Sequence, residues 1–313
     1  YTYVFFAVTI ILLATLRSVE TVKIAFWLSV MAFCVNCCIN YVLIYGRFGA
    51  PELGAKGAAI GTLAARIAEC AVLLVYIAKK EKKLHLQLKD YFRADRLMAG
   101  DYFRVCLPML VVQGLWGLNT ALQTVILGHM SAAAIAANSA ASTLFLLVKS
   151  MSVGASSTAS VIVGKTIGTG NIPLVKHYSS IMQRMFVVIG LVSGLLLFLI
   201  RIPVMTLYDL SPEGMEMMNT FLIILSVVCV GMSYQMPTNN GIIRGGGNAM
   251  FVVKMDLVSI WMIVIPLSFA MAFVVKASPA VVVCCLNADQ IFKCVPAFLE
   301  SHYGNWIRKL TRE

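Results

Sequence analysis

Long apolar runs separated by short polar clusters dominate this sequence. A helix needs about 20 apolar residues to cross the hydrocarbon core of a bilayer. Because lipid offers no hydrogen bonds to an exposed backbone, runs of this length predict membrane-spanning α-helices. Eight complete spans are predicted at 24–46, 57–78, 105–128, 134–164, 178–202, 217–243, 255–275 and 278–298, and the run at 1–16 is a partial ninth.

The composition excludes an ordinary soluble domain, because 60% of the residues are hydrophobic and only 12% are charged, against about a quarter charged in soluble proteins. The net charge of +11 comes from Lys and Arg gathered between the apolar runs, and it forms no basic face for nucleic acid. The nine cysteines lie almost entirely within apolar runs, so we expect packing residues and neither disulfides nor a metal site.

The distribution of positive charge predicts the orientation, because Lys and Arg prefer cytoplasmic loops. The densest basic cluster, KKEKKLHLQLKDYFRADR, follows Ala78. Placing it inside and alternating the spans puts Lys165, Arg244 and Arg308 inside as well. We therefore expect a multi-pass protein of the cell inner (cytoplasmic) membrane with a cytoplasmic C-terminus.

A weak internal repeat indicates two related halves. The segment LATLRSVETVKIAFWLSV recurs in outline as NGIIRGGGNAMFVVKMDLVSIW, so that Arg17 corresponds to Arg244. The offset predicts halves of six spans and an intact all-α protein of two six-helix bundles, in which about three helices precede Tyr1. The predicted domains are the C-terminal part of the N-lobe (1–78), a cytoplasmic basic linker (79–104), the C-lobe (105–300) and a cytoplasmic tail (301–313).

Four strings resemble the multidrug and toxic compound extrusion family. They are NCCINYVLIYGRFGAPELGAKGAAIGT, VGASSTASVIVGKTIGTGN, IIRGGGNAMFVVKMDLVSIWMIVIPLSF and DQIFKCVPAFLESHYGNWIRKLTRE, in the order that the family shows. The positions that carry this resemblance, read as structural, are Asn36, Asn40, Gly46, Gly49, Pro51, Gly54, Gly57, Pro108, Arg244 and Pro266. The resemblance covers nearly the whole chain.

The resemblance implies a V-shaped carrier that exports cationic organic compounds in exchange for Na+ or H+, with no other cofactor. The sequence departs from the family where acids are expected. Gln113 occupies the place of a glutamate that follows Pro108 in many members, and a further family carboxylate corresponds to the region of Ser233. The coupling ion is therefore left open.

Ionisable side chains inside spans are costly, roughly 2.5 to 3.5 kcal/mol on insertion scales, and call for a partner or a function. Arg66 and Glu69 lie three residues apart on one helix face, where they are close enough to pair. Either they form a structural ion pair or they serve proton or cation passage. Lys149 lies near the middle of its span. It either bonds backbone carbonyls and the hydroxyls of Ser150 and Ser152, or it lines a watery cavity.

Asp256 lies near the start of its span, and is either a carboxylate favoured by the helix dipole or part of ion coupling. A polar and aromatic stripe with helical spacing predicts the substrate wall, although interhelical hydrogen bonding would produce the same pattern. The predicted substrate pathway consists of Gln113, Trp116, Asn119, Gln123, Lys149, Tyr234 and Gln235.

Three functions remain to be compared. The first is efflux of small, cationic compounds by a monomer in contact with lipid. The second is a flippase of the same superfamily for lipid-linked saccharides or peptidoglycan precursors, for which Lys149 is mild support. The third is an intramembrane enzyme, which would need an acid pair, a His motif or a Ser/Lys dyad. All four histidines lie at loops or span ends, so we do not expect an enzyme.

Overall fold

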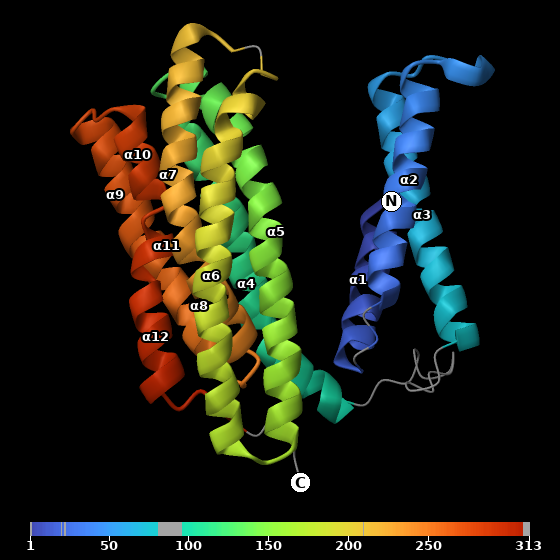
Figure 1. Ribbon diagram of the computed structural model, residues 1–313, viewed down its shortest axis with the longest axis vertical. Helices are drawn as coiled ribbons and strands as arrows, with labels where there is room; N and C mark the ends of the chain where they lie inside the picture. The colour runs from blue at the N-terminus through green and yellow to red at the C-terminus, as the bar shows by residue number, and fades with distance from the viewer. Residues whose placement is uncertain (1, 20, 22, 81–95, 209, 309–313) are drawn as a thin grey trace. The chain divides into compact units, whose positions relative to one another are not determined.

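The computed structural model describes residues 2–308 except 20, 22, 81–95 and 209, and within them the regular structure is helical (Figure 1). The chain forms two compact units, residues 1–96 and 97–313, called here the N-terminal and C-terminal units. The boundary falls inside the predicted linker 79–104, most of which lies outside the described residues. The expected all-α polytopic fold is confirmed, whereas the assignment of the units to lobes stays a prediction.

The N-terminal unit consists of three long helices and one short turn. They are α1 (Thr2–Ser18), α2 (Lys23–Ile44), η1 (Arg47–Gly49) and α3 (Ala55–Lys80). Leu16, Leu28 and Leu73 form its buried core. Gly46 adopts a φ of 63° in the turn after α2, a left-handed conformation that glycine adopts without strain. A Cβ on Gly57 would lie 2.7 Å from the carbonyl oxygen of Leu43, so this glycine lets α2 and α3 pack closely.

The C-terminal unit begins with four long helices. They are α4 (Arg96–Gly128), α5 (Ala132–Gly168), α6 (Ile172–Met205) and α7 (Pro212–Pro237), and the last continues as the π-helical segment η3 (Thr238–Ile243). Side chains at the starts of three helices accept backbone N–H bonds, namely Ser131, Asn171 and Ser211. Such caps satisfy donors that a helix start leaves unpaired.

The last two spans of the C-terminal unit are divided into short segments. The first is α8 (Ala249–Leu257), η4 (Val258–Val264), α9 (Ile265–Phe269) and η5 (Ala270–Val274), and the second is α10 (Pro279–Leu286), α11 (Asp289–Phe292) and α12 (Cys294–Tyr303). Both η4 and η5 are π-helical. Such widened turns inside helices frequently occur at functional sites.

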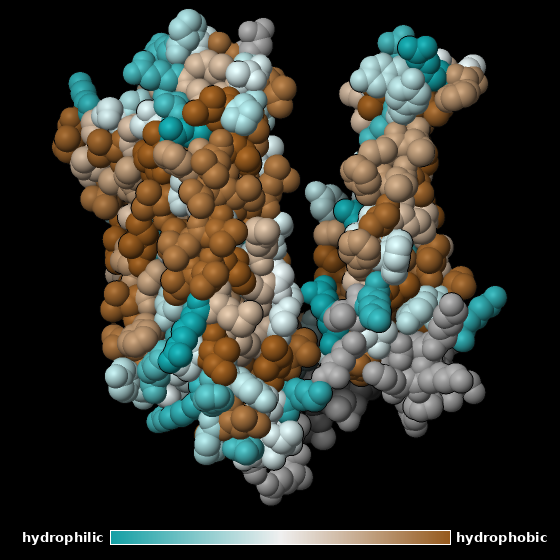
Figure 2. Space-filling view, in the orientation of Figure 1, coloured by the Kyte–Doolittle hydropathy of each residue, from teal (hydrophilic) through white to brown (hydrophobic). Residues whose placement is uncertain are grey.

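The predicted spans are confirmed. Eight helical stretches of the described chain are long and apolar enough to cross a membrane, and α1 is a shorter apolar helix. Within each unit the apolar side chains form a belt between polar ends (Figure 2). Large apolar side chains such as Leu147, Leu199 and Met262 are 66%, 60% and 72% exposed. A surface of this kind is stable against lipid and not against water.

Basic side chains gather at one end of the C-terminal unit. The α5–α6 turn and the end of α12 lie at this end (Figure 1), and Lys165, Lys176 and Arg244 border the turns there. The predicted tail also begins at this end, but α12 extends to Tyr303 and the ring of Trp306 is fully buried. Trp306 donates its indole N–H to the carbonyl of Ser301. Residues 304–308, which follow α12, are therefore packed onto the bundle through Trp306.

Candidate functional site

The predicted substrate wall lies on α4, but its four side chains differ in burial. Gln113 is exposed, Trp116 is 48% exposed, Asn119 is 5% exposed and Gln123 is half-buried. The side-chain oxygen of Asn119 is buried, and no described residue donates a hydrogen bond to it. An unsatisfied acceptor inside a membrane bundle calls for a ligand or a water. This face of α4 is therefore exposed at Gln113 and buried at Asn119.

The structure brings Lys149 of α5 to this wall. Its ammonium nitrogen lies 5.2 Å from the centre of the Trp116 ring, within the range of a cation–π interaction. The hydroxyls of Ser150 and Ser152 are hydrogen-bonded elsewhere, so the predicted bonds from Lys149 to them are not formed. The carboxylate of Asp289 attracts the Lys149 ammonium electrostatically. Lys149 thus lies over an aromatic face and is attracted by the charge of Asp289.

Tyr234 and Gln235 of α7 join different polar groups from those on α4. The Tyr234 hydroxyl donates to the side-chain oxygen of Gln183 at 2.8 Å. Gln235 donates to Gln290 at 2.8 Å and accepts from Asn239 at 3.0 Å. Within the described residues, neither side chain is hydrogen-bonded to the α4 wall. Their predicted place in the substrate pathway stays a prediction.

Asp256 belongs to a buried charge cluster that sequence reasoning missed. The ammonium of Lys293 lies 2.8 Å from Asp256 and 2.9 Å from Asp289, and the side chains of Lys293 and Asp289 are 4% and 7% exposed. Asp256 is the eighth residue of α8 (Ala249–Leu257), beyond the first turn where a helix dipole acts. The helix-dipole interpretation of Asp256 is therefore replaced by an ion pair between helices.

A sequence signal for this cluster existed. Asp289 and Lys293 lie four residues apart, a spacing that lets two side chains pair on one helix, just as three residues separate Arg66 and Glu69. The link to Asp256, 37 residues away, has no local signal. Only the packing of the last two spans reveals it.

A small pocket connects the α4 wall with this cluster. It has a volume of about 100 Å³ and is bounded by Gln113 on α4, Arg244 between η3 and α8, and Asp256 on α8. Arg244 also donates to the sulfur of Met109 at 3.1 Å. We call it the α4–α8 pocket. It brings together three residues that the sequence predicts for separate roles.

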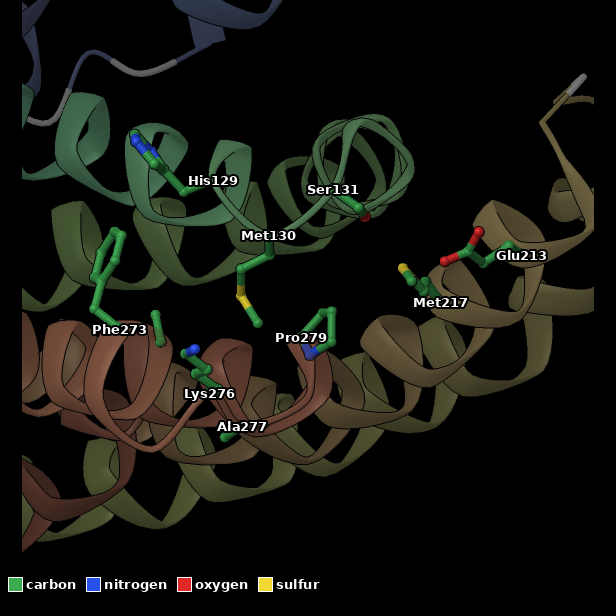
Figure 3. A pocket seen from close by; sticks show the side chains of 10 residues that line it. His129, Met130, Ser131, Glu213, Met217, Phe273, Lys276, Ala277 and Pro279 are labelled. Atoms are coloured by element: carbon green, nitrogen blue, oxygen red, sulfur yellow. The ribbon is translucent and has the colours of Figure 1, made fainter.

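A larger cavity lies at the other end of the C-terminal unit. It has a volume of about 510 Å³ and is called here the α7–η5 cavity. Met130 points into it between Phe273 on one side and Met217 on the other, and Glu213 and Lys276 supply charges at its border (Figure 3). Apolar walls with a few charged groups are typical of sites for small organic ligands. The sequence does not single out this cavity.

The N-terminal unit contains the predicted pair of Arg66 and Glu69. Their side chains form an ion pair of 2.7 Å, with Arg66 35% and Glu69 6% exposed. The guanidinium also lies 4.6 Å from the centre of the Phe6 ring. Both charges border a cavity of about 410 Å³ between α2 and α3. Pairing is confirmed, whereas the choice between a structural and an ion-conducting role stays open.

The same cavity contains polar groups of the family-like strings. Asn40 donates to Asn36 at 3.0 Å, and Asn36 donates to Thr62 of α3 at 3.5 Å. Interhelical hydrogen bonds of this kind hold membrane helices together. The remaining motif residues lie where the chain turns or where a span begins or changes: Gly46 after α2, Pro51 before α3, Gly57 in α3, Pro108 inside α4, Arg244 between η3 and α8, and Pro266 at the start of α9.

Comparison with known sequences identifies several relatives that are named for multidrug resistance. The MatE family profile matches residues 108–270. The protein named "Probable multidrug resistance protein NorM" from Streptococcus pneumoniae is 26% identical over 258 residues, which cover 81% of this chain and 56% of that protein. The protein of the same name from Thermotoga maritima is 24% identical over 285 residues, covering 89% and 60%. The chain thus spans little more than half the length of these relatives.

Solved structures show the same fold. A structure described as "MATE in the straight conformation" superposes with a TM-score of 0.80 at 16% identity, covering 91% of this chain and 63% of that chain. The Vibrio cholerae MATE transporter VcmN in the bent form gives 0.73 at 16% identity, covering 98% and 67%. Because the family profile matches more than half of its residues, this chain belongs to the MatE family of multidrug and toxic compound extrusion proteins.

Proposed function

We propose that the protein exports small cationic organic compounds from the cell by antiport against Na+ or H+, as a monomer in the inner membrane with its C-terminus in the cytoplasm. Membership of the MatE family supports transport, and relatives named for multidrug resistance support drug-like substrates. No catalytic step is required for this activity.

The contact between Trp116 and Lys149 carries the proposal. In it, a half-exposed aromatic ring of α4 already has a cation over its face, at 5.2 Å from the ring centre. An organic cation makes the same interaction with an indole ring, and its strength rises when water is excluded. Substrate binding then requires Lys149 to leave the ring.

The α7–η5 cavity supports an exit for such substrates. Its volume of about 510 Å³ is within the range of 300–1,000 Å³ that ligand sites typically have. Glu213 supplies a negative charge, and Met130, Met217 and Phe273 supply polarizable or aromatic surface. Flexible thioethers accommodate differently shaped apolar groups. The positive charge of Lys276 at the same border limits how long a cation stays.

Transport in proteoliposomes tests the proposed function. The full-length protein should accumulate ethidium against its gradient when an opposing Na+ or H+ gradient is imposed, because exchange links the two fluxes. Trp116→Ala should lower the rate about tenfold, since an aromatic–cation contact of roughly 0.5 to 2 kcal/mol is lost. Ethidium fluorescence inside the vesicles measures both.

Trp27→Ala is the matched control, because the Trp27 side chain is 65% exposed on the apolar surface of α2, and it should leave the rate unchanged. Ethidium transport that ignores both gradients contradicts antiport. Movement of a fluorescent lipid-linked saccharide in place of ethidium would establish the flippase alternative.

A further inference from the structure

The last span of the C-terminal unit contains a lysine enclosed by two carboxylates. The Lys293 ammonium lies 2.8 Å from an oxygen of Asp256 on α8 and 2.9 Å from an oxygen of Asp289 on α11. Only 4% of the Lys293 side chain is exposed. Two negative charges and one positive charge give this charge cluster a formal charge of −1.

Ionisable side chains inside a membrane bundle are costly and mark ion and proton pathways. We propose that the Asp256–Lys293–Asp289 cluster is the proton-binding site of the C-terminal unit, with Asp256 as the residue that carries the proton. The inference rests on the proposed antiport and names its coupling ion as H+.

The position of Lys293 favours a proton over a metal cation. Its ammonium occupies the space between the two carboxylates, at the distances given above, where Na+ would need both oxygens as ligands. A metal ion would have to expel this tethered charge or lie beside it against Coulomb repulsion. A proton needs no such space, because it binds to one carboxylate oxygen and leaves Lys293 in place.

Asp289 is enclosed by its hydrogen-bond and ion-pair partners. It accepts a hydrogen bond from the side-chain amide of Gln290 at 2.9 Å in addition to the ion pair with Lys293. Gln290 is in turn fixed by Gln235 at 2.8 Å. Lys149 on α5 adds a further electrostatic attraction. With 7% of its side chain exposed, against 29% for Asp256, Asp289 is the member of the pair that water reaches less readily.

Asp256 has fewer hydrogen-bond partners than Asp289 and is more open to water. Its side chain is 29% exposed and borders the α4–α8 pocket, whose volume of about 100 Å³ holds several waters but no drug-sized molecule. The charged groups around it are Lys293 in the ion pair, Arg244 across the pocket and the exposed Lys254 on its own helix. Arg244 and Lys254 belong to the end of the unit that is predicted to face the cytoplasm.

The pocket thus gives Asp256 a route for proton release toward the cytoplasm. The carboxyl O–H passes its proton to a pocket water, and the resulting carboxylate accepts an N–H from Lys293, as seen here. When Asp256 takes up a proton from a pocket water, its carboxylate becomes neutral. The ion pair with Lys293 that joins α8 to the last span is then lost. Gln113 of the α4 wall borders the same pocket. Proton release from Asp256 therefore takes place next to the substrate wall.

Two assays on the full-length protein in proteoliposomes test this assignment. The first measures the steady-state ethidium ratio under a pH gradient of one unit without Na+. For one-to-one exchange, wild type should approach a ratio of about ten, since one pH unit is equivalent to a tenfold concentration ratio. The second measures exchange of ethidium at equal pH, which needs no net proton movement.

Asp256→Asn should reduce the ratio to about one and retain the equal-pH exchange, whereas Asp256→Glu should restore part of the ratio. Glu300→Gln is the matched control. Glu300 lies on α12 in the same span and bonds to Asn248, outside the cluster, so this variant should keep the wild-type ratio.

The outcomes distinguish failure of the proton-site assignment from failure of the proposed efflux function. An Asp256→Asn protein that still follows the pH gradient, or that loses exchange together with the gradient response, overturns the assignment. A wild-type protein that exchanges ethidium but responds only to Na+ also overturns it and leaves efflux intact. Absence of ethidium exchange by wild type contradicts the proposed function itself.

Discussion

At the scale of single residues, the structure distinguishes contacts within one helix from contacts between helices. The spacing of Arg66 and Glu69 predicts their pairing because both lie on α3. The contact of Lys149 with Trp116 joins two spans, and the sequence contains no measure of their relative rotation. Polar side chains of a membrane bundle are therefore recognisable from sequence, whereas their partners depend on helix packing.

Lys149 makes a prediction at this scale. Lys149→Ala removes a cation that occupies the Trp116 ring and repels other cations, so ethidium should bind about three- to tenfold more tightly, in keeping with the strength of cation–π contacts. Equilibrium dialysis of the purified full-length protein measures the Kd. We expect little change in thermal stability, because Lys149 makes no salt bridge among the described residues.

Lys176→Ala serves as the control, since Lys176 is exposed near the start of α6, lines none of the cavities described above and should not alter ethidium binding. Weaker binding by Lys149→Ala would indicate that the lysine supports the wall. A variant that does not fold would favour a structural role.

At the scale of elements, the lengths of apolar runs predict the spans well because helix length is fixed by bilayer thickness. They do not predict how a span is divided. The span from Ala249 to Val274 contains two π-helical segments, and the last span breaks near Asn287. These irregularities depend on polar partners in neighbouring helices, such as the hydrogen bond between Gln235 and Gln290. The periodicity of apolar residues in the sequence therefore does not predict them.

The close approach of α7 and α11 predicts a steric effect. A Cβ on Gly231 would lie 2.6 Å from the carbonyl oxygen of Gln290. Gly231→Ala should therefore push α11 away, disrupt the Gln235–Gln290 bond and cost about 1 to 3 kcal/mol, as overpacking does. Thermal unfolding of the purified protein in detergent measures the loss.

Gly154→Ala is the matched helix substitution, because a Cβ at Gly154 of α5 meets no atom within 4 Å. It should be neutral or stabilising by roughly 0.5 to 1 kcal/mol, since alanine favours helix over glycine. Equal destabilisation by both substitutions would refute the steric explanation.

At the scale of the whole molecule, the order of spans in the C-terminal unit fixes which loops share an end. The backbone N–H of Arg308 donates to the carbonyl of Gly246, which joins the residues that follow α12 to the break after η3. The α5–α6 turn lies at the same end (Figure 1). The positive-inside rule then assigns this end to the cytoplasm. The side of the membrane is a proposal that topology measurements decide.

Reporter fusions test this orientation. Alkaline phosphatase, which is active only outside the cytoplasm, should be inactive when fused after Glu313 and active when fused at Glu213, in the first turn of α7. Green fluorescent protein should show the opposite pattern, because it does not fold after export in this way. Equal phosphatase activity at both sites would refute the alternating scheme.

The buried Trp306 restricts how the end of the chain can be altered. Its ring contacts Gly246, where an added Cβ would overlap it, and the neighbouring Gly247 and Ile307 form a β-bridge. Trp306 and Ile307 thereby fix the loop between η3 and α8 in place. A shortened gene product that stops before this tryptophan would leave a hole beneath the loop, and an affinity tag is best joined beyond residue 308.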